Sequence, residues 1–164
     1  GQMPYLEEHI SAKKQIWERY KEGLSDLPVS MNPIPENVKS NYWLSCMLIN
    51  REAMCSQVRS DMETLYHSEP GKSCPDEILA ALKWANCEGR PIWKPMHMQP
   101  IYRNNPFITR DGPGRGRTDA YITGKAAMDV GADIFQRGLC LPSDNKMTED
   151  EQETVIEIVR RCFR

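Results

Sequence analysis

The stretch Leu139-Cys-Leu-Pro-Ser-Asp-Asn-Lys-Met-Thr-Glu-Asp-Glu151 predicts a short strand followed by a helix with a defined first residue. The apolar run Leu139–Leu141 stops at Pro142, which is typical of a brief buried strand. Thr148 and Glu151 have the spacing of a capping box, in which each side chain accepts a backbone N–H of the other residue. The helix that follows has one apolar side, formed by Val155, Ile156, Ile158, Val159 and Phe163.

Two further helices are predicted in the first half of the chain. The segment from Leu6 to about Gly23 is amphipathic, because its apolar residues recur at intervals of three and four. A second helix opens at Ser73-Cys-Pro-Asp76, where proline suits the first turn and the acid lies near the positive end of the helix dipole. It is expected to run to about Cys87 and to be closed by Gly89. Its predicted buried side contains Ile78, Leu79, Leu82 and the region of Trp84.

The remaining elements are shorter. Residues 41–50 form an apolar run with aromatics, which predicts a mostly buried strand with Trp43 in the core. Residues 51–64 fit either a short helix or irregular structure, and Glu69-Pro-Gly71 predicts a turn. Met128 to Gln136 predicts a short helix that ends at Gly138. Because helices alternate with short strands, the predicted class is α/β or α+β.

Composition excludes several classes of function. A chain of 164 residues fits one domain, and its net charge of −2 provides no basic field for nucleic acid or anionic membranes. The mean hydropathy of −0.62 and the lack of a long apolar run predict no membrane span. The first residues lack the features of a signal peptide. Six cysteines without a Cys-x-x-Cys pair, and three histidines distant from them in sequence, predict reduced thiols, no metal site and a cytoplasmic location.

The segment Arg90-Pro-Ile-Trp-Lys-Pro-Met-His-Met-Gln-Pro-Ile-Tyr102 is the most informative for function. Its three prolines exclude an ordinary helix or central strand, so we expect a rigid loop. The loop holds Trp93, Lys94, His97 and Gln99 at close spacing, which is typical of a binding site. No carboxylate lies near His97 in the sequence. Its imidazole therefore fits three roles: a general acid or base, a hydroxyl-binding group, or a hydrogen-bonded loop residue.

A second polar segment, Asp111–Arg117, is rich in glycine and arginine. Arg110, Arg115 and Arg117 could bind phosphate, since glycines expose backbone N–H groups and arginine binds phosphate bidentately. The glycines do not follow a strand and open a helix, as nucleotide-binding loops require. We therefore favour a flexible, solvated insertion.

Four segments resemble, in the same order, the C-terminal small domain of DegT/DnrJ/StrS-type sugar aminotransferases. The loop Arg90–Tyr102 carries the closest likeness, followed by Phe135–Ser143 together with Met147–Gln152. Gly1-Gln2 and the helix ending at Leu24 are similar to the helix that leads into that domain. Asn41–Leu44 is similar to its first strand. The resemblance implies a short, mostly antiparallel sheet covered by helices, and a single small domain over residues 1–164 with a linking helix at 5–23.

The resemblance also implies an activity. Enzymes of this family use pyridoxal phosphate, have fold type I, and transfer an amino group from an amino acid such as glutamate to a keto-sugar nucleotide. The resemblance implies that Lys94, His97 and Gln99 lie near the sugar or its diphosphate, with Trp93 and Met96 shaping the wall. It implies as partners a large pyridoxal phosphate domain and a second subunit in a homodimer.

The Schiff-base lysine of the family lies in the large domain, before a Gly-Glu-Gly-Gly-like stretch. Lys125 lacks that context. We therefore expect no catalytic residue in this chain, no covalent pyridoxal phosphate on it, and no activity without the large domain. The alternative is a non-catalytic module that binds a nucleotide-sugar or docks onto another subunit through the Trp93–Gln99 loop.

Overall fold

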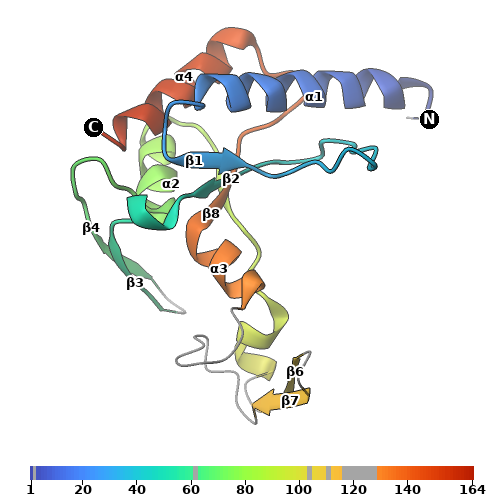
Figure 1. The fold of residues 1–164 in the computed structure, drawn as a ribbon. Helices are drawn as coiled ribbons and strands as arrows, with labels where there is room; N and C mark the ends of the chain where they lie inside the picture. Colours follow the sequence, from blue (N-terminus) through green and yellow to red (C-terminus); the bar gives the residue numbers. More distant parts are fainter. Residues whose placement is uncertain (2, 61–62, 103–104, 110–111, 116–128) are drawn as a thin grey trace. The chain divides into compact units, whose positions relative to one another are not determined.

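The computed structural model describes residues 1, 3–60, 63–102, 105–109, 112–115 and 129–164, and Figure 1 shows its elements. The chain divides into two compact units. Unit 1 comprises Gly1–Pro91 and Arg137–Arg164, and unit 2 comprises Ile92–Gln136. Unit 2 is therefore an insertion between two strands of unit 1.

A four-stranded sheet forms the centre of unit 1. Its strands are antiparallel and follow the order β1-β2-β8-β5. In the register, Met47 lies opposite Leu139 and Val29 lies opposite Ile49. The strands are β1 (Val29–Met31), β2 (Ser45–Ile49), β8 (Gly138–Leu141) and β5 (Arg90–Pro91). The predicted class, a small antiparallel sheet covered by helices, is confirmed.

Three helices pack on one face of this sheet. They are α1 (Leu6–Gly23), α2 (Pro75–Trp84) and α4 (Glu149–Arg161). Figure 1 shows α1 and α4 side by side, and α4 also contacts α2. The helices and the sheet share one core, whose buried members include Tyr20, Leu24, Met47, Ile49, Ile78, Leu82, Leu139, Leu141, Val155, Ile156 and Val159. Among the described residues, no helix is both long and apolar enough to cross a bilayer.

Several hydrogen bonds join α1 to the C-terminal segment that follows β8. The buried Tyr20 hydroxyl donates to the Pro142 carbonyl at 2.7 Å, and burial raises the pKa of Tyr20. The amide of Gln152 donates to the Ile16 carbonyl at 2.6 Å. These bonds satisfy polar groups that would otherwise be buried without partners, so they fix how α1 lies against α4.

The other elements of unit 1 are short. A 3-10 turn, η1 (Met3–Tyr5), precedes α1, and a second, η2 (Arg51–Ala53), follows β2. The strands β3 (Ser56–Arg59) and β4 (Thr64–His67) form an antiparallel hairpin that the sequence pattern did not predict. The predicted turn at Glu69–Gly71 is present, and Gly71 has a φ of 77°, which favours glycine.

Unit 2 contains two 3-10 turns, η3 (Met96–Met98) and η4 (Pro100–Tyr102), the hairpin β6 (Phe107–Thr109) and β7 (Gly112–Arg115), and most of α3 (Val130–Arg137). The prediction of a flexible Asp111–Arg117 segment is wrong for Gly112–Arg115, because strand pairing with β6 orders this backbone. Arg110, Arg117, Lys125 and Met128 lie outside the described residues.

Two tryptophans expected in or near the core are on the surface. Trp43 is 65% exposed, because β2 begins only at Ser45 and Tyr42, with a φ of 52°, turns the backbone before it. Trp84 is 91% exposed at the last residue of α2. Both predictions are wrong for the same reason. An aromatic side chain is not a sufficient sign of burial, because large apolar side chains are also common on protein surfaces.

Gly89 does not close α2. The helix ends at Trp84, and Asn86 takes the left-handed conformation with a φ of 57°. Gly89 instead permits close packing. A Cβ placed there would lie 2.8 Å from Leu79 Cδ2, 3.0 Å from Leu82 Cδ1 and 3.2 Å from the Cys140 carbonyl oxygen. Glycine at this position therefore avoids close contacts with the ends of both leucine side chains and with the Cys140 carbonyl.

All six cysteines are free thiols, and three of them (Cys55, Cys74 and Cys140) are buried. Burial raises the pKa of Cys74 to about 12 and that of Cys162 to about 11, so both thiols stay protonated at neutral pH. Cys46 and Cys140 lie opposite each other on β2 and β8, with their sulfur atoms 3.7 Å apart.

The predicted capping box of α4 is confirmed. The Thr148 hydroxyl accepts the Glu151 N–H at 3.2 Å, and the Glu151 carboxylate accepts the Thr148 N–H at 2.8 Å.

We expect Thr148→Ala to lower the free energy of unfolding by about 1 kcal/mol, because one N–H at the helix start loses its partner. The matched control is Thr154→Ala, which removes an exposed hydroxyl from the same helix. It should change stability by less than about 0.5 kcal/mol. Urea unfolding measures both, and equal losses in the two variants would show that the box does not stabilise the helix.

Candidate functional site

The loop predicted as a binding site is built from two turns of 3-10 helix in unit 2. Pro95 starts the first turn, and the Met98 N–H donates to the Pro95 carbonyl at 2.9 Å. The Tyr102 N–H closes the second turn by donating to the Gln99 carbonyl at 3.0 Å. Proline is suited to these positions because its ring fixes φ and the turn does not need its missing donor. The expectation that no ordinary helix forms here is confirmed.

Gln99 and Met98 hold the loop in place. The Gln99 side-chain amide donates to the Lys94 carbonyl at 3.1 Å, which ties the end of the loop to its beginning. Met98 is buried, whereas Met96 on the same turn is 64% exposed. The loop therefore has an anchored side and an open side.

His97 lies against a carboxylate that the sequence did not indicate. The Asp129 Oδ2 atom is 2.5 Å from His97 Nε2, and the two side chains are only 7% and 15% exposed. The expectation that no carboxylate orients this imidazole is wrong. Asp129 is distant in sequence, and only the fold of unit 2 brings it to the loop.

Asp129 is held by the first turn of α3. Its Oδ1 atom accepts the Ala132 N–H at 3.0 Å, and its carbonyl accepts the Asp133 N–H at 2.9 Å, so it acts as the N-cap of the helix. Gly131 allows α3 to approach the loop, since a Cβ there would lie 3.4 Å from Pro95 Cγ. One oxygen of this carboxylate thus accepts a hydrogen bond from the start of α3, and the other oxygen contacts the imidazole.

This arrangement determines what the imidazole can do. The contact of 2.5 Å between His97 Nε2 and Asp129 Oδ2 directs this ring nitrogen at the carboxylate, and a proton on Nε2 is compatible with it. The carboxylate thereby orients the ring. With Nε2 turned toward Asp129, the neutral ring can accept a hydrogen bond from a hydroxyl group or take up a proton through Nδ1.

The structure places all five predicted residues in unit 2, on one short loop. Trp93 is 62% exposed and Met96 is similarly open, while Lys94, His97 and Gln99 are half-buried. Gln99 is engaged in the loop through its amide, so its direct contribution to ligand binding is limited to its remaining donor and its carbonyl oxygen. Asp129 is the site residue that sequence reasoning missed. An aspartate just before a predicted helix indicates an N-cap, but not its second partner.

Pyridoxal phosphate requires a lysine, a carboxylate facing its pyridine nitrogen and donors for its phosphate. The loop offers Lys94, and the start of α3 offers Asp129. That carboxylate is already bonded to His97 and to the backbone of α3. The described part of unit 2 therefore does not form a site for this cofactor on its own.

Two open pockets among the described residues of unit 1 contain none of the five predicted residues. One, of about 480 Å³, lies between α1 and β1, where the Lys21 ammonium is 5.1 Å from the centre of the Trp17 ring. The other, of about 540 Å³, lies beside the end of α2 and the start of α4 and has exposed acids at its rim. The lining of neither pocket includes a histidine.

The comparisons with known proteins agree with the fold. Residues 1–160 match the model of the DegT/DnrJ/EryC1/StrS aminotransferase family. EpsN of Bacillus subtilis (strain 168), named as a pyridoxal phosphate-dependent aminotransferase, is 31% identical over 99% of this chain and 34% of its own length. GDP-perosamine synthase of Vibrio cholerae is 20% identical over 99% of this chain and 35% of its own length.

A solved structure of DesI, determined in the presence of its TDP-sugar product, has the same fold with a TM-score of 0.67. It is 16% identical, and the match covers 98% of this chain and 33% of that protein. The chain thus spans about a third of the length of the relatives that it matches. With its family match over nearly every residue, this chain belongs to the DegT/DnrJ/EryC1/StrS aminotransferase family.

Proposed function

We propose that this chain is the small-domain part of a pyridoxal phosphate-dependent nucleotide-sugar aminotransferase. The reaction is amino transfer from an amino acid such as glutamate to a keto-sugar carried on a nucleotide. Family membership supports the reaction class, and two relatives support a nucleotide-sugar: one is named a GDP-perosamine synthase and the other was solved with a TDP-sugar product.

The observation that carries the substrate proposal is the His97–Asp129 pair on the loop. An imidazole oriented by a mostly buried carboxylate, beside an exposed indole and an exposed thioether, suits a sugar. In this proposal His97 accepts a hydrogen bond from a sugar hydroxyl, and Asp129 positions the imidazole. Trp93 and Met96 contact the apolar face of the sugar ring, and Lys94 neutralises part of the diphosphate charge. Gln99 supports the loop and offers an amide to the ligand.

Pyridoxal phosphate and the Schiff-base lysine belong, in this proposal, to a large domain that works with this chain, together with a second subunit in a homodimer. Exposed apolar side chains support such packing. Met3, Tyr5 and Leu6 at the start of α1 are all exposed. Val38 and Trp43 are also exposed. They lie on a segment that is joined to α1 by an ion pair between Lys39 and Glu7 at 3.6 Å. Such side chains are often covered by a partner surface.

The test uses the complete protein that contains this chain, with ¹⁵N-glutamate and GDP- or TDP-linked keto-sugars. We expect mass spectrometry to show ¹⁵N in the sugar product, dependent on pyridoxal phosphate. The 164-residue chain assayed alone is the control. It should transfer no nitrogen, and borohydride in the presence of pyridoxal phosphate should fix no single lysine.

Two outcomes would contradict the proposal. Specific borohydride labelling of Lys125 would place the catalytic lysine in this chain. Calorimetric binding of sugar nucleotides by a complete protein that never transfers nitrogen would favour a non-catalytic binding module.

A further inference from the structure

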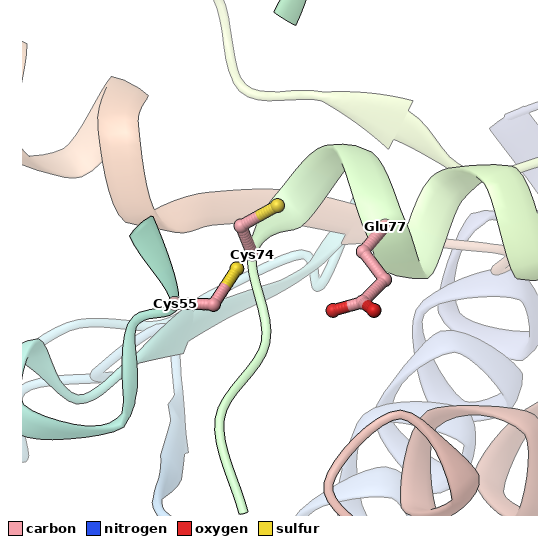
Figure 2. A group of neighbouring side chains, drawn as sticks. All are labelled: Cys55, Cys74 and Glu77. Carbon is pink, nitrogen blue, oxygen red and sulfur yellow. The ribbon is translucent and has the colours of Figure 1, made fainter. Parts of the chain in front are cut away.

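Two cysteines and a glutamate that are separated in sequence come together beside the first turn of α2. The Cys55 and Cys74 sulfur atoms and a Glu77 carboxylate oxygen all lie within 4.8 Å of one another. Figure 2 shows the three side chains, with Cys55 on the segment before β3 and Cys74 and Glu77 at the start of α2. The cysteines are widely spaced in the sequence, which predicts no metal site, but the fold brings Cys55 and Cys74 together.

The backbone holds the two cysteines in place. The Cys55 N–H donates to the Ser73 carbonyl at 3.0 Å, and the Ser73 N–H donates to the Ala53 carbonyl at 3.0 Å. These two bonds join the chain before β3 to the chain before α2, next to both thiols. Cys74 is the residue just before α2, and Glu77 lies three positions later on the same side of the first turn. The ligand atoms therefore belong to rigid elements of unit 1.

Glu77 is oriented by two hydroxyl groups. Ser68 Oγ donates to Oε1 at 2.5 Å, and the buried Ser73 Oγ donates to Oε2 at 2.7 Å. Each carboxylate oxygen has a second lone pair, so these bonds leave capacity for a metal. Hydrogen bonds that fix a ligating carboxylate are a regular part of metal sites. The hydrogen bonds from Ser68 and Ser73 to Glu77 are an observation independent of the clustering of the three ligands.

We propose that Cys55, Cys74 and Glu77 bind one zinc ion. Two thiolates and a carboxylate match the ligands that Zn²⁺ prefers, whereas Mg²⁺ and Ca²⁺ require oxygen ligands only. Tetrahedral Zn²⁺ with Zn–S distances of about 2.3 Å needs its sulfur atoms about 3.8 Å apart, so the side chains need to close by no more than about 1 Å. Binding releases the two thiol protons to solvent, and a water occupies the fourth position.

The local charges favour a zinc ion at this site. Two thiolates and one carboxylate leave the site with a net charge of −1 when Zn²⁺ is bound, and the positive end of the α2 dipole lies at Cys74. The adjacent acid, Asp76, pairs with Arg59 at 2.9 Å, which offsets part of its charge. A zinc ion here links the segment before β3 to α2.

The test uses the reduced 164-residue chain after removal of metals by a chelator, titrated with Co²⁺ as a spectroscopic probe. We expect a thiolate-to-cobalt absorption band that saturates at one equivalent and is displaced by Zn²⁺. Cys55→Ser and Cys74→Ser should abolish the band. Glu77→Gln keeps both thiols and should weaken Co²⁺ binding at least tenfold. Zn²⁺ should raise the melting temperature of the original chain but not that of Cys74→Ser.

The matched control is Cys87→Ser, since the Cys87 thiol lies outside the cluster and donates to the nearby Ala85 carbonyl, which a serine hydroxyl can also reach. It should bind Co²⁺ as the original chain does. Circular dichroism verifies that each variant is folded. A folded original chain without the thiolate band would overturn the proposal. So would a band that survives in folded Cys74→Ser, or one lost equally in Cys87→Ser.

Discussion

Replacing His97 with alanine in the complete protein is expected to lower kcat/KM for the keto-sugar nucleotide by about 100-fold or more. A positioned imidazole that transfers a proton or binds a developing charge contributes an effect of that order. Asp129→Asn should lower kcat/KM by about 10-fold to 100-fold, because an amide holds the ring less firmly. The expected order of increasing kcat/KM is therefore His97→Ala, then Asp129→Asn, then the original protein.

The two half-reactions separate a substrate contact from general damage to the enzyme. If His97 contacts the sugar nucleotide, the half-reaction with glutamate should proceed at the original rate in both variants, and only the half-reaction with the keto-sugar should slow. Rapid-mixing absorbance measurements follow each one. The matched control is His9→Ala, which removes an exposed imidazole from α1. Equal slowing of both half-reactions, or no change in either, would show that the pair does not act on the sugar.

The second large effect is on stability. Leu82 on α2 is completely buried in the core shared by the three helices and the sheet. Leu82→Ala should lower the free energy of unfolding by about 2–5 kcal/mol, since it removes buried apolar surface and leaves a cavity. The melting temperature should fall by roughly 5–15 °C in a chain of this size. Leu65→Ala, on the exposed side of β4, makes the same chemical change and should have almost no effect.

The close approach of Gly89 to Leu82 allows a second test of how Leu82 packs. A Cβ at Gly89 would lie 3.0 Å from Leu82 Cδ1, so Gly89→Ala alone forces the leucine side chains to move. In the Leu82→Ala background that contact is gone, and only the contacts with Leu79 and the Cys140 carbonyl remain. Gly89→Ala should therefore cost less in the double variant than alone. Strict additivity in thermal unfolding would show that the two residues do not pack as described.

Elements with local signals could be predicted from the sequence. The start of α4 depends on Thr148 and Glu151, which lie three residues apart, and the structure has both capping bonds. The bounds of α1 follow from its apolar spacing and from the glycine at its end. Strand β8 follows from a short apolar run that stops at a proline.

Elements stabilised by distant partners could not be predicted in this way. Strand β1 has only three residues, and pairing with β2 orders it. The segment Gly112–Arg115 has the composition of a flexible loop, yet pairing with β6 makes it a strand. The same limit applies to the site. The loop residues were visible as a cluster in sequence, but Asp129 reaches His97 only after the insertion has folded.

The strands that lead into and out of the insertion also affect how the inserted segment can vary in evolution. Arg90 and Pro91 on β5 lie directly opposite Cys140 and Leu139 on β8. The two ends of the inserted segment are thus about 5 Å apart, the spacing of facing residues in an antiparallel pair. Segments of different length can join such ends with little extra cost in closure entropy. Residues 92–136 therefore form a segment whose length and sequence can change while the three-helix scaffold of unit 1 stays as it is.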